Sequence, residues 1–103
     1  MKLSSFSAIP ENNEELHLPE LVYWSSLGEV EQVKLLLEQG VDVNSIDEEG
    51  YSALQAAAEN NYIEIVQLLL EHGADKALKG QYTALELAEM AGNKDIVLYL
   101  KAY

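Results

Sequence analysis

The sequence predicts an all-α solenoid of three short helical pairs, and two internal repeats carry that prediction. The stretch VEQVKLLLEQ (30–39) returns as IEIVQLLLEH (63–72), an offset of 33 residues. The stretch SALQAAAENNYIEIVQLL (52–69) aligns with TALELAEMAGNKDIVLYL (83–100) at an offset of 31 residues. Self-similarity at such a period indicates stacked units, because one thin helical pair cannot bury its apolar face alone.

The first helix of the second and third copies begins at a capping signal. Ser52 and Thr83 are followed three residues later by Gln55 and Glu86, which is the pattern of a reciprocal capping box. The alanine-rich stretches that follow predict slim helices suited to close packing. An Asn-Asn pair or an Ala-Gly pair, both tolerant of left-handed backbone, then predicts the end of each helix.

The second helix of each pair is predicted by apolar residues at helical spacing. In the middle copy these residues are Ile65, Val66, Leu68 and Leu69. Gly40 and Gly73 stand where a left-handed helix terminator is expected. The connections VDVNSIDEEG and ADKALKGQ predict extended β-hairpin excursions, and the second should be the shorter because two residues are missing at that junction.

These features resemble the ankyrin repeat, a turn and two antiparallel helices of about 33 residues. The middle copy carries Asp47, Gly50, Ser52-Ala53-Leu54, Ala57-Ala58, Ile65-Val66, Leu68-Leu69-Leu70 and Gly73-Ala74-Asp75 of that pattern. Gln55 and Glu86 replace the usual histidine. The resemblance covers residues 19–103 and implies an arm (1–18), an N-terminal capping repeat (19–46), a central repeat (47–79) and a C-terminal capping repeat (80–103).

The end units should be polar on their outward sides. Gln32 and Lys101 fit this expectation, since both replace apolar residues of the other copies. Trp24 takes the place of a small alanine and needs space. We expect the arm to fold back over it, with Phe6, Ile9 or Leu16 in contact; the alternative is a disordered arm and a partly exposed indole.

The last helix presents an apolar spot of Leu98, Tyr99 and Tyr103. Local packing of the chain end would explain it. The alternative is contact with a partner or with a second copy of the chain, so a monomer is expected and a homodimer through these residues is the other reading.

The chain has 18 acidic residues, six lysines, no arginine and a net charge of −12. Such a surface repels nucleic-acid phosphates and anionic lipid headgroups, so neither partner is expected. Solubility alone can explain the charge, whereas the functional interpretation is a basic protein partner. No apolar run is long enough to span a membrane, and no signal peptide is evident, so a cytoplasmic location is expected by default.

No catalytic or metal-binding motif occurs, and cysteine is absent. Acid pairs arise by chance among 18 carboxylates, and His72, just before a terminating glycine, should be structural. We therefore expect no cofactor, no metal and no enzyme; a small enzyme or ligand-binding protein is the remote alternative. Asn44 resembles a hairpin asparagine that is hydroxylated in some ankyrin proteins, although its ordinary role is to hydrogen-bond the turn.

By resemblance, a partner would bind a concave face made from the hairpin tips and the ends of the first helices. The corresponding positions are Ser26, Leu27, Ile46, Glu48, Glu49, Tyr51, Glu59, Asn60, Tyr82, Met90 and Ala91, with Lys79 as a weaker counterpart. Tyrosine beside carboxylate suits protein binding, although Tyr51 and Tyr82 can equally pack on neighbouring hairpins. The sequence thus predicts a protein-binding module, either an immunity protein that neutralises a basic toxin or a general regulatory adaptor.

Overall fold

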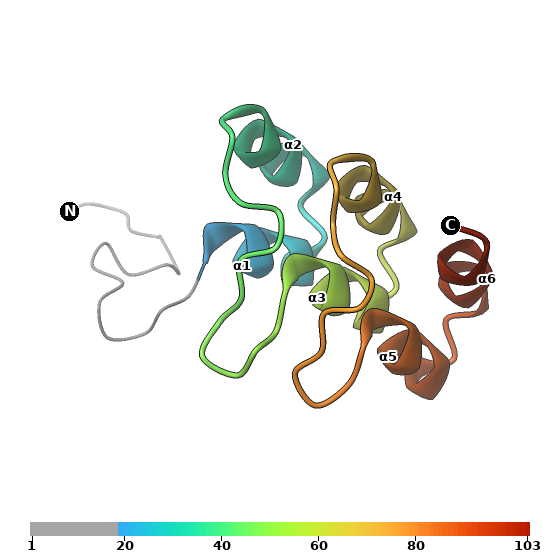
Figure 1. Ribbon diagram of the computed structural model, residues 1–103. Coiled ribbons are helices and arrows are strands. Elements are labelled where there is room, and N and C mark those ends of the chain that lie inside the picture. Colours follow the sequence, from blue (N-terminus) through green and yellow to red (C-terminus); the bar gives the residue numbers. More distant parts are fainter. Residues whose placement is uncertain (1–18) are drawn as a thin grey trace.

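The computed structural model describes residues 19–103 and contains six α-helices in that range, with no strand among the described residues (Figure 1). The helices are α1 (Glu20–Leu27), α2 (Val30–Glu38), α3 (Ala53–Glu59), α4 (Ile63–Glu71), α5 (Ala84–Ala91) and α6 (Lys94–Ala102). The predicted all-α class is confirmed. The expected contact of the arm with Trp24 lies outside the described residues.

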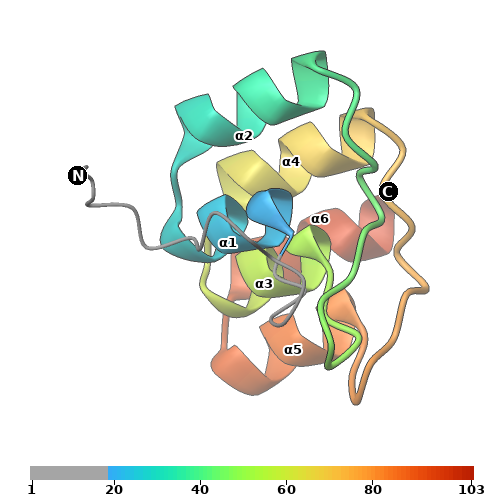
Figure 2. The same cartoon turned by 90° about the vertical axis from the view of Figure 1, so that its left-hand side faces the viewer.

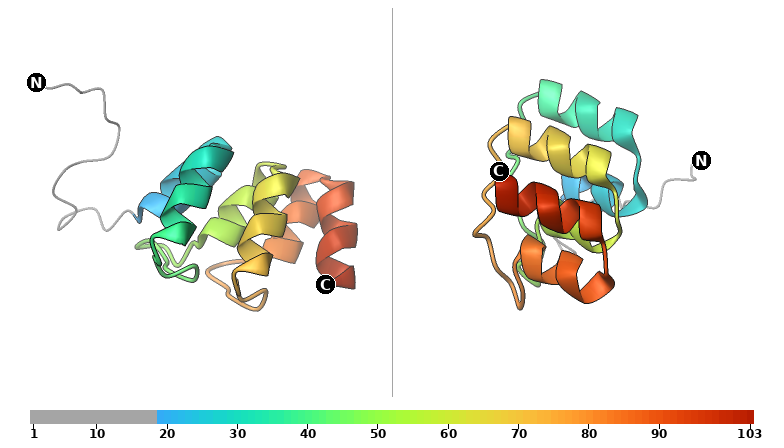
Figure 3. Two further views of the ribbon diagram at one scale, coloured as in Figure 1. Left: turned by 90° about the horizontal axis from the view of Figure 1, so that it is seen from above. Right: turned by 90° about the vertical axis from the view of Figure 1, so that its right-hand side faces the viewer.

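The helices form two layers. α1, α3 and α5 lie side by side in one row, and α2, α4 and α6 form the second row across from them (Figures 1 and 2). The view from above shows the three pairs following one another along the solenoid (Figure 3). Both long loops extend from the same side, where they pass the ends of the first-row helices.

Capping and small side chains explain the central first-row helices. The Ser52 hydroxyl accepts a hydrogen bond from the Gln55 backbone N–H at 3.3 Å, and Gln55 Oε1 accepts one from the Ser52 N–H at 2.8 Å. Thr83 and Glu86 repeat this box at the start of α5. The alanines of α3 are fully buried, because the slim helix packs directly between α1 and α5.

The second-row helices supply the larger core side chains. In α4, Ile65, Val66 and Leu69 have no exposed surface. Their counterparts are buried too, Val33 and Leu37 in α2 and Ile96 and Leu100 in α6. Full burial of one such side chain contributes about 1.5–3 kcal/mol. The apolar residues that recur in the second helix of each copy are therefore those buried between neighbouring helical pairs.

The predicted helix terminators adopt the expected backbone. Gly40 and Gly73 have φ of 87° and 91°, and Asn61, which follows α3, has φ of 67°. The left-handed region disfavours side chains with a Cβ, so glycine or asparagine ends these helices at the lowest strain.

Each loop is closed by one isolated antiparallel bridge and forms no longer strand pair. The bridges join Ile46 to Ser52 and Lys79 to Thr83. They enclose residues 47–51 in the first loop but only 80–82 in the second, so the two missing residues are lost from the tip. The first tip keeps its shape through the Asp47 carboxylate, which accepts hydrogen bonds from two backbone N–H groups farther along the turn.

Asn44 links the two loops. Its Oδ1 accepts a hydrogen bond from the Asp75 N–H at 2.8 Å, and its own N–H donates to the Asp42 carboxylate at 2.9 Å. The structural role expected for this side chain is therefore present, and hydroxylation of Asn44 stays a prediction.

Replacing Asn44 with Ala should lower the free energy of unfolding by about 1 kcal/mol, since the Asp75 N–H loses its acceptor. Urea denaturation of the variant measures this loss. Asn44→Asp keeps an oxygen acceptor and should retain most of the stability. If Asn44→Ala leaves the free energy of unfolding unchanged, solvent replaces the lost hydrogen bond without penalty.

The large apolar side chains of the two end units differ in how far they are exposed. Trp24 is partly buried against the core and meets the ring of Tyr23 edge-on at 5.0 Å. Leu98 is 66% exposed, as expected, but Tyr99 packs against the core and Tyr103 donates a hydrogen bond to the Leu70 carbonyl. Leu98 and Tyr103 are both exposed, Tyr103 at 57%, whereas Tyr99 is partly buried, so only part of the predicted apolar spot faces solvent.

Candidate functional site

A groove lies between the loop tips and the helices α3 and α5. Its volume is ≈ 720 Å³, and its lining residues are Glu49, Tyr51, Glu59, Gln81, Tyr82, Leu87 and Met90. Five of these seven belong to the predicted partner-binding positions. The groove thus lies on the face that the sequence predicts, although nothing bound to it tests that assignment.

Backbone contacts hold the two loop tips together at the mouth of this groove. A Cβ at Gly80 would lie 2.9 Å from the Glu49 carbonyl oxygen, so the second tip packs directly on the first. Gln55 Nε2 then donates a hydrogen bond at 2.8 Å to the Tyr82 carbonyl, which fixes the second loop to α3. The side chains of the tips are therefore presented by a restrained backbone.

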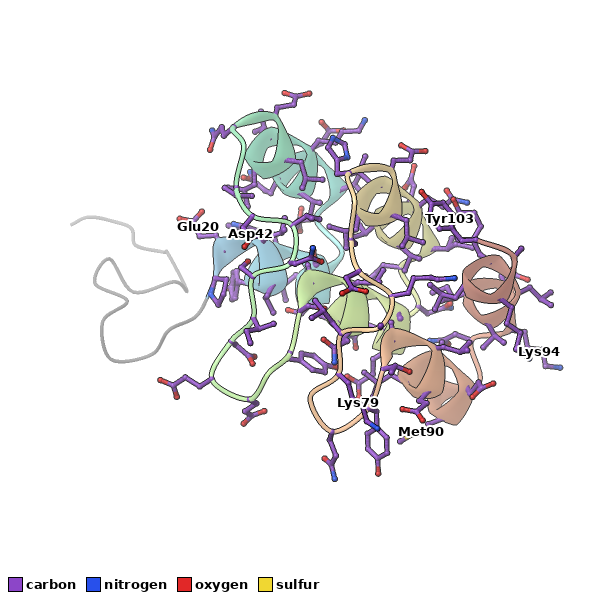
Figure 4. The ribbon with its side chains drawn as sticks, in the orientation of Figure 1. Glu20, Asp42, Lys79, Met90, Lys94 and Tyr103 are labelled. Atoms are coloured by element: carbon purple, nitrogen blue, oxygen red, sulfur yellow. The ribbon has the colours of Figure 1, made fainter. Side chains whose placement is uncertain are left out.

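The groove combines negative charge with an apolar wall. Glu49 and Glu59 are exposed, and no lysine lines the groove. Leu87 is 6% exposed and Met90 is 63% exposed, so the apolar surface runs from a buried floor to an open rim. Figure 4 shows Met90 on α5 and Lys79 on the neighbouring loop.

Tyr51 and Tyr82 occupy different environments although they hold similar places in the repeats. Tyr51 is partly buried against the core, and its hydroxyl is buried without a hydrogen-bond partner. Tyr82 is 37% exposed. The buried hydroxyl of Tyr51 is therefore out of reach of a group in the groove, whereas Tyr82 presents exposed surface.

The other predicted positions are not among the lining residues of the groove. Leu27 and Ile46 are each 49% exposed, and Glu48 and Ala91 are exposed as well. The Ser26 hydroxyl donates to the Tyr23 carbonyl, and the Asn60 amide donates to the Ala56 carbonyl. Ser26 therefore already bonds the backbone of α1, and Asn60, which follows α3, already bonds the backbone of that helix.

Sequence reasoning missed two lining residues, Gln81 and Leu87. Leu87 could have been found, because it lies three residues before Met90 and so shares its side of α5. Gln81 could not be assigned from the repeat pattern, since it falls in the shortened tip where the register is lost.

The described part of the chain, residues 19–103, shows no arrangement that points to metal chemistry. No group of three or more His, Cys, Asp or Glu side chains could hold a metal ion there. His72 Nδ1 lies 2.9 Å from the Leu68 carbonyl oxygen of its own helix, which fits its expected structural role. Within the same range no helix has the length and apolar character needed to cross a bilayer.

Comparison with known proteins identifies the class. A family profile described as ankyrin repeats (3 copies) matches residues 21–103. The chain therefore belongs to the ankyrin-repeat family. Because ankyrin repeats mediate protein–protein binding, the chain is a protein-interaction module.

Individual relatives agree with this assignment. The chain is 34% identical over 95 residues to ankyrin repeat and SAM domain-containing protein 6 of Mus musculus, a match that covers 88% of this chain and 11% of the relative. It is 41% identical over 61 residues to Notch-regulated ankyrin repeat-containing protein B of Danio rerio, covering 57% of this chain and 55% of the relative.

A third relative is the putative ankyrin repeat protein FPV018 of Fowlpox virus, 40% identical over 68 residues, which are 65% of this chain and 10% of the relative. The chain thus spans from about a tenth to about half of the length of these three relatives. What is shared is the repeat itself, and the activities of the whole relatives do not transfer with it.

Proposed function

We propose that this chain is a non-enzymatic binding module whose groove takes up a basic segment of a partner protein. The observation that carries the proposal is the composition of the groove: two exposed carboxylates stand beside an apolar wall, and no lysine is among the lining residues. Lysine and arginine match such a surface, since their stems pack on apolar groups while the charged head reaches an acid.

The geometry suggests a division of roles. Leu87 and Met90 would contact the stem of the partner's side chain, and Glu49 and Glu59 would bind its charged head. The net charge of −12 would accelerate association with a basic protein and would make capture weaker at high salt.

A narrower proposal is an immunity or inhibitor role, in which a basic toxin such as a nuclease is bound and neutralised in the cytoplasm. Its support is the strong negative charge, which complements a basic nuclease surface. The competing proposal is a regulatory adaptor. A toxin-like reading frame beside this gene would favour the inhibitor, whereas an isolated gene would favour the adaptor.

Reversing the two groove charges tests the binding site. Glu49→Lys with Glu59→Lys should weaken partner binding at least about tenfold, because attraction becomes repulsion at the contact. The matched control is Glu38→Lys with Glu71→Lys, which makes the same change in net charge at exposed positions of α2 and α4.

The experiment is affinity capture from a lysate of the source organism, with elution by rising salt and titration of the captured protein. Basic proteins should be retained by the wild type and the control but lost from the groove variant. Retention by the groove variant, or equal loss from both variants, would place binding elsewhere. Capture of neutral or acidic proteins would contradict the proposal that the groove carboxylates select a basic partner.

A further inference from the structure

The outer face of the last helical pair holds a second hollow, away from the groove. Its volume is ≈ 390 Å³, and it is lined by Glu89, Gly92, Lys94, Val97 and Leu98. Leu98 is 66% exposed, although the residues in its register, Lys34 and Gln67, are polar. A helix position that is polar in the other two copies is expected to face solvent, so this apolar surface is not explained by packing among the described residues.

We propose that this face binds a second copy of the same chain about a two-fold axis. The charges at this hollow are self-complementary, because Glu89 on α5 and Lys94 at the start of α6 both line it. In a two-fold contact Glu89 of each copy can meet Lys94 of the other, while the two Leu98 side chains pack between them. A two-fold interface requires self-complementarity of this kind.

The charge distribution along the chain selects this face over the others. Residues 20–71 contain eleven acids and a single lysine, Lys34, whereas residues 84–103 contain three acids and two lysines. Two copies that each carry −12 repel one another at most surfaces. The last pair is nearly neutral, so contact there meets the least repulsion. A basic partner would instead be drawn to the acidic remainder of the chain.

The structure also holds α6 in place for such a contact. Lys76 Nζ donates a hydrogen bond to the Leu100 carbonyl at 2.9 Å, and Tyr103 donates one to the Leu70 carbonyl at 2.9 Å. Figure 4 shows Tyr103 on the side of α6 that faces α4 and Lys94 on the opposite, outer side. The outer face therefore belongs to α6, whose opposite side is held to the rest of the fold by these two hydrogen bonds.

Analytical ultracentrifugation of the full chain tests the proposal. A single helical pair offers a small interface, so a weak dimer is expected over a range of about 5–500 µM protein. Leu98→Glu should raise the dimer dissociation constant at least about tenfold. Leu35→Glu is the matched control, because Leu35 is a 50% exposed leucine on α2 at the other end of the solenoid; it should leave dimerisation unchanged.

Charge exchange provides the second arm of the experiment. Lys94→Glu alone should weaken the dimer, and Lys94→Glu combined with Glu89→Lys should restore it, since the two-fold pairs reform with opposite polarity. A wild type that stays monomeric at the highest concentration overturns the proposal. So does a dimer that is equally sensitive to Leu35→Glu and Leu98→Glu, or one that the double exchange does not restore.

Discussion

Replacing Gln55 with Glu is expected to lower the free energy of unfolding by about 2–4 kcal/mol, a large share of the stability of a chain this size. Gln55 is 1% exposed and uses both ends of its amide. Its oxygen completes the capping box, and its Nε2 donates to the Tyr82 carbonyl of the next repeat. A carboxylate keeps the first bond but has no donor for the second, and it buries a charge beside a carbonyl dipole.

The third repeat supplies the control for this substitution. Glu86 occupies the equivalent capping position, is only partly buried, and has no following loop to bond within the described residues. Glu86→Gln should therefore change stability by less than about 0.5 kcal/mol.

Urea denaturation of both variants measures the contrast. The Gln55→Glu loss should shrink in acid relative to wild type, because the protonated carboxyl regains an O–H donor. Equal effects at the two positions would mean that the bond to Tyr82 contributes little.

The same residue shows what sequence could and could not provide. The capping box of Gln55 lies within four residues, so local pattern predicts it correctly. Its bond to Tyr82 spans 27 positions and depends on how far the shortened loop reaches. The repeats predict the fold because each copy carries the same local signals for its helices and turns. Contacts between copies that differ in sequence can be identified only in the packed structure.

The candidate site divides along the same line. Glu49, Tyr51 and Met90 followed from register within the repeats, and all three line the groove. Identical registers nevertheless gave unlike environments, since Tyr51 is partly buried while Tyr82 is exposed. The two-residue deletion moves the second tip relative to the first, and no pattern in the sequence states the direction of that shift.

Replacing Gly28 with Ala is expected to destabilise the fold by about 2–4 kcal/mol, because two penalties coincide there. Gly28 ends α1 with φ of 79°, a left-handed conformation that a Cβ disfavours. An added Cβ would also lie 2.6 Å from Cε1 of Tyr62, at the junction between the first and second repeats. Either the ring moves out of its packed position or the two repeats separate.

Gly40→Ala separates the two penalties, since Gly40 has φ of 87° but no atom within 4 Å of the added Cβ. It should lose only the backbone term, about 1 kcal/mol. In a Tyr62→Ala background the Gly28→Ala loss should fall to that same value, because the clash is gone while the strain persists. Denaturation curves of the four variants test this cycle. If Gly28→Ala and Gly40→Ala lower the free energy of unfolding equally, the Tyr62 ring moves away from the added Cβ without cost. The contact between Gly28 and Tyr62 would then contribute nothing to the packing of the first repeat on the second.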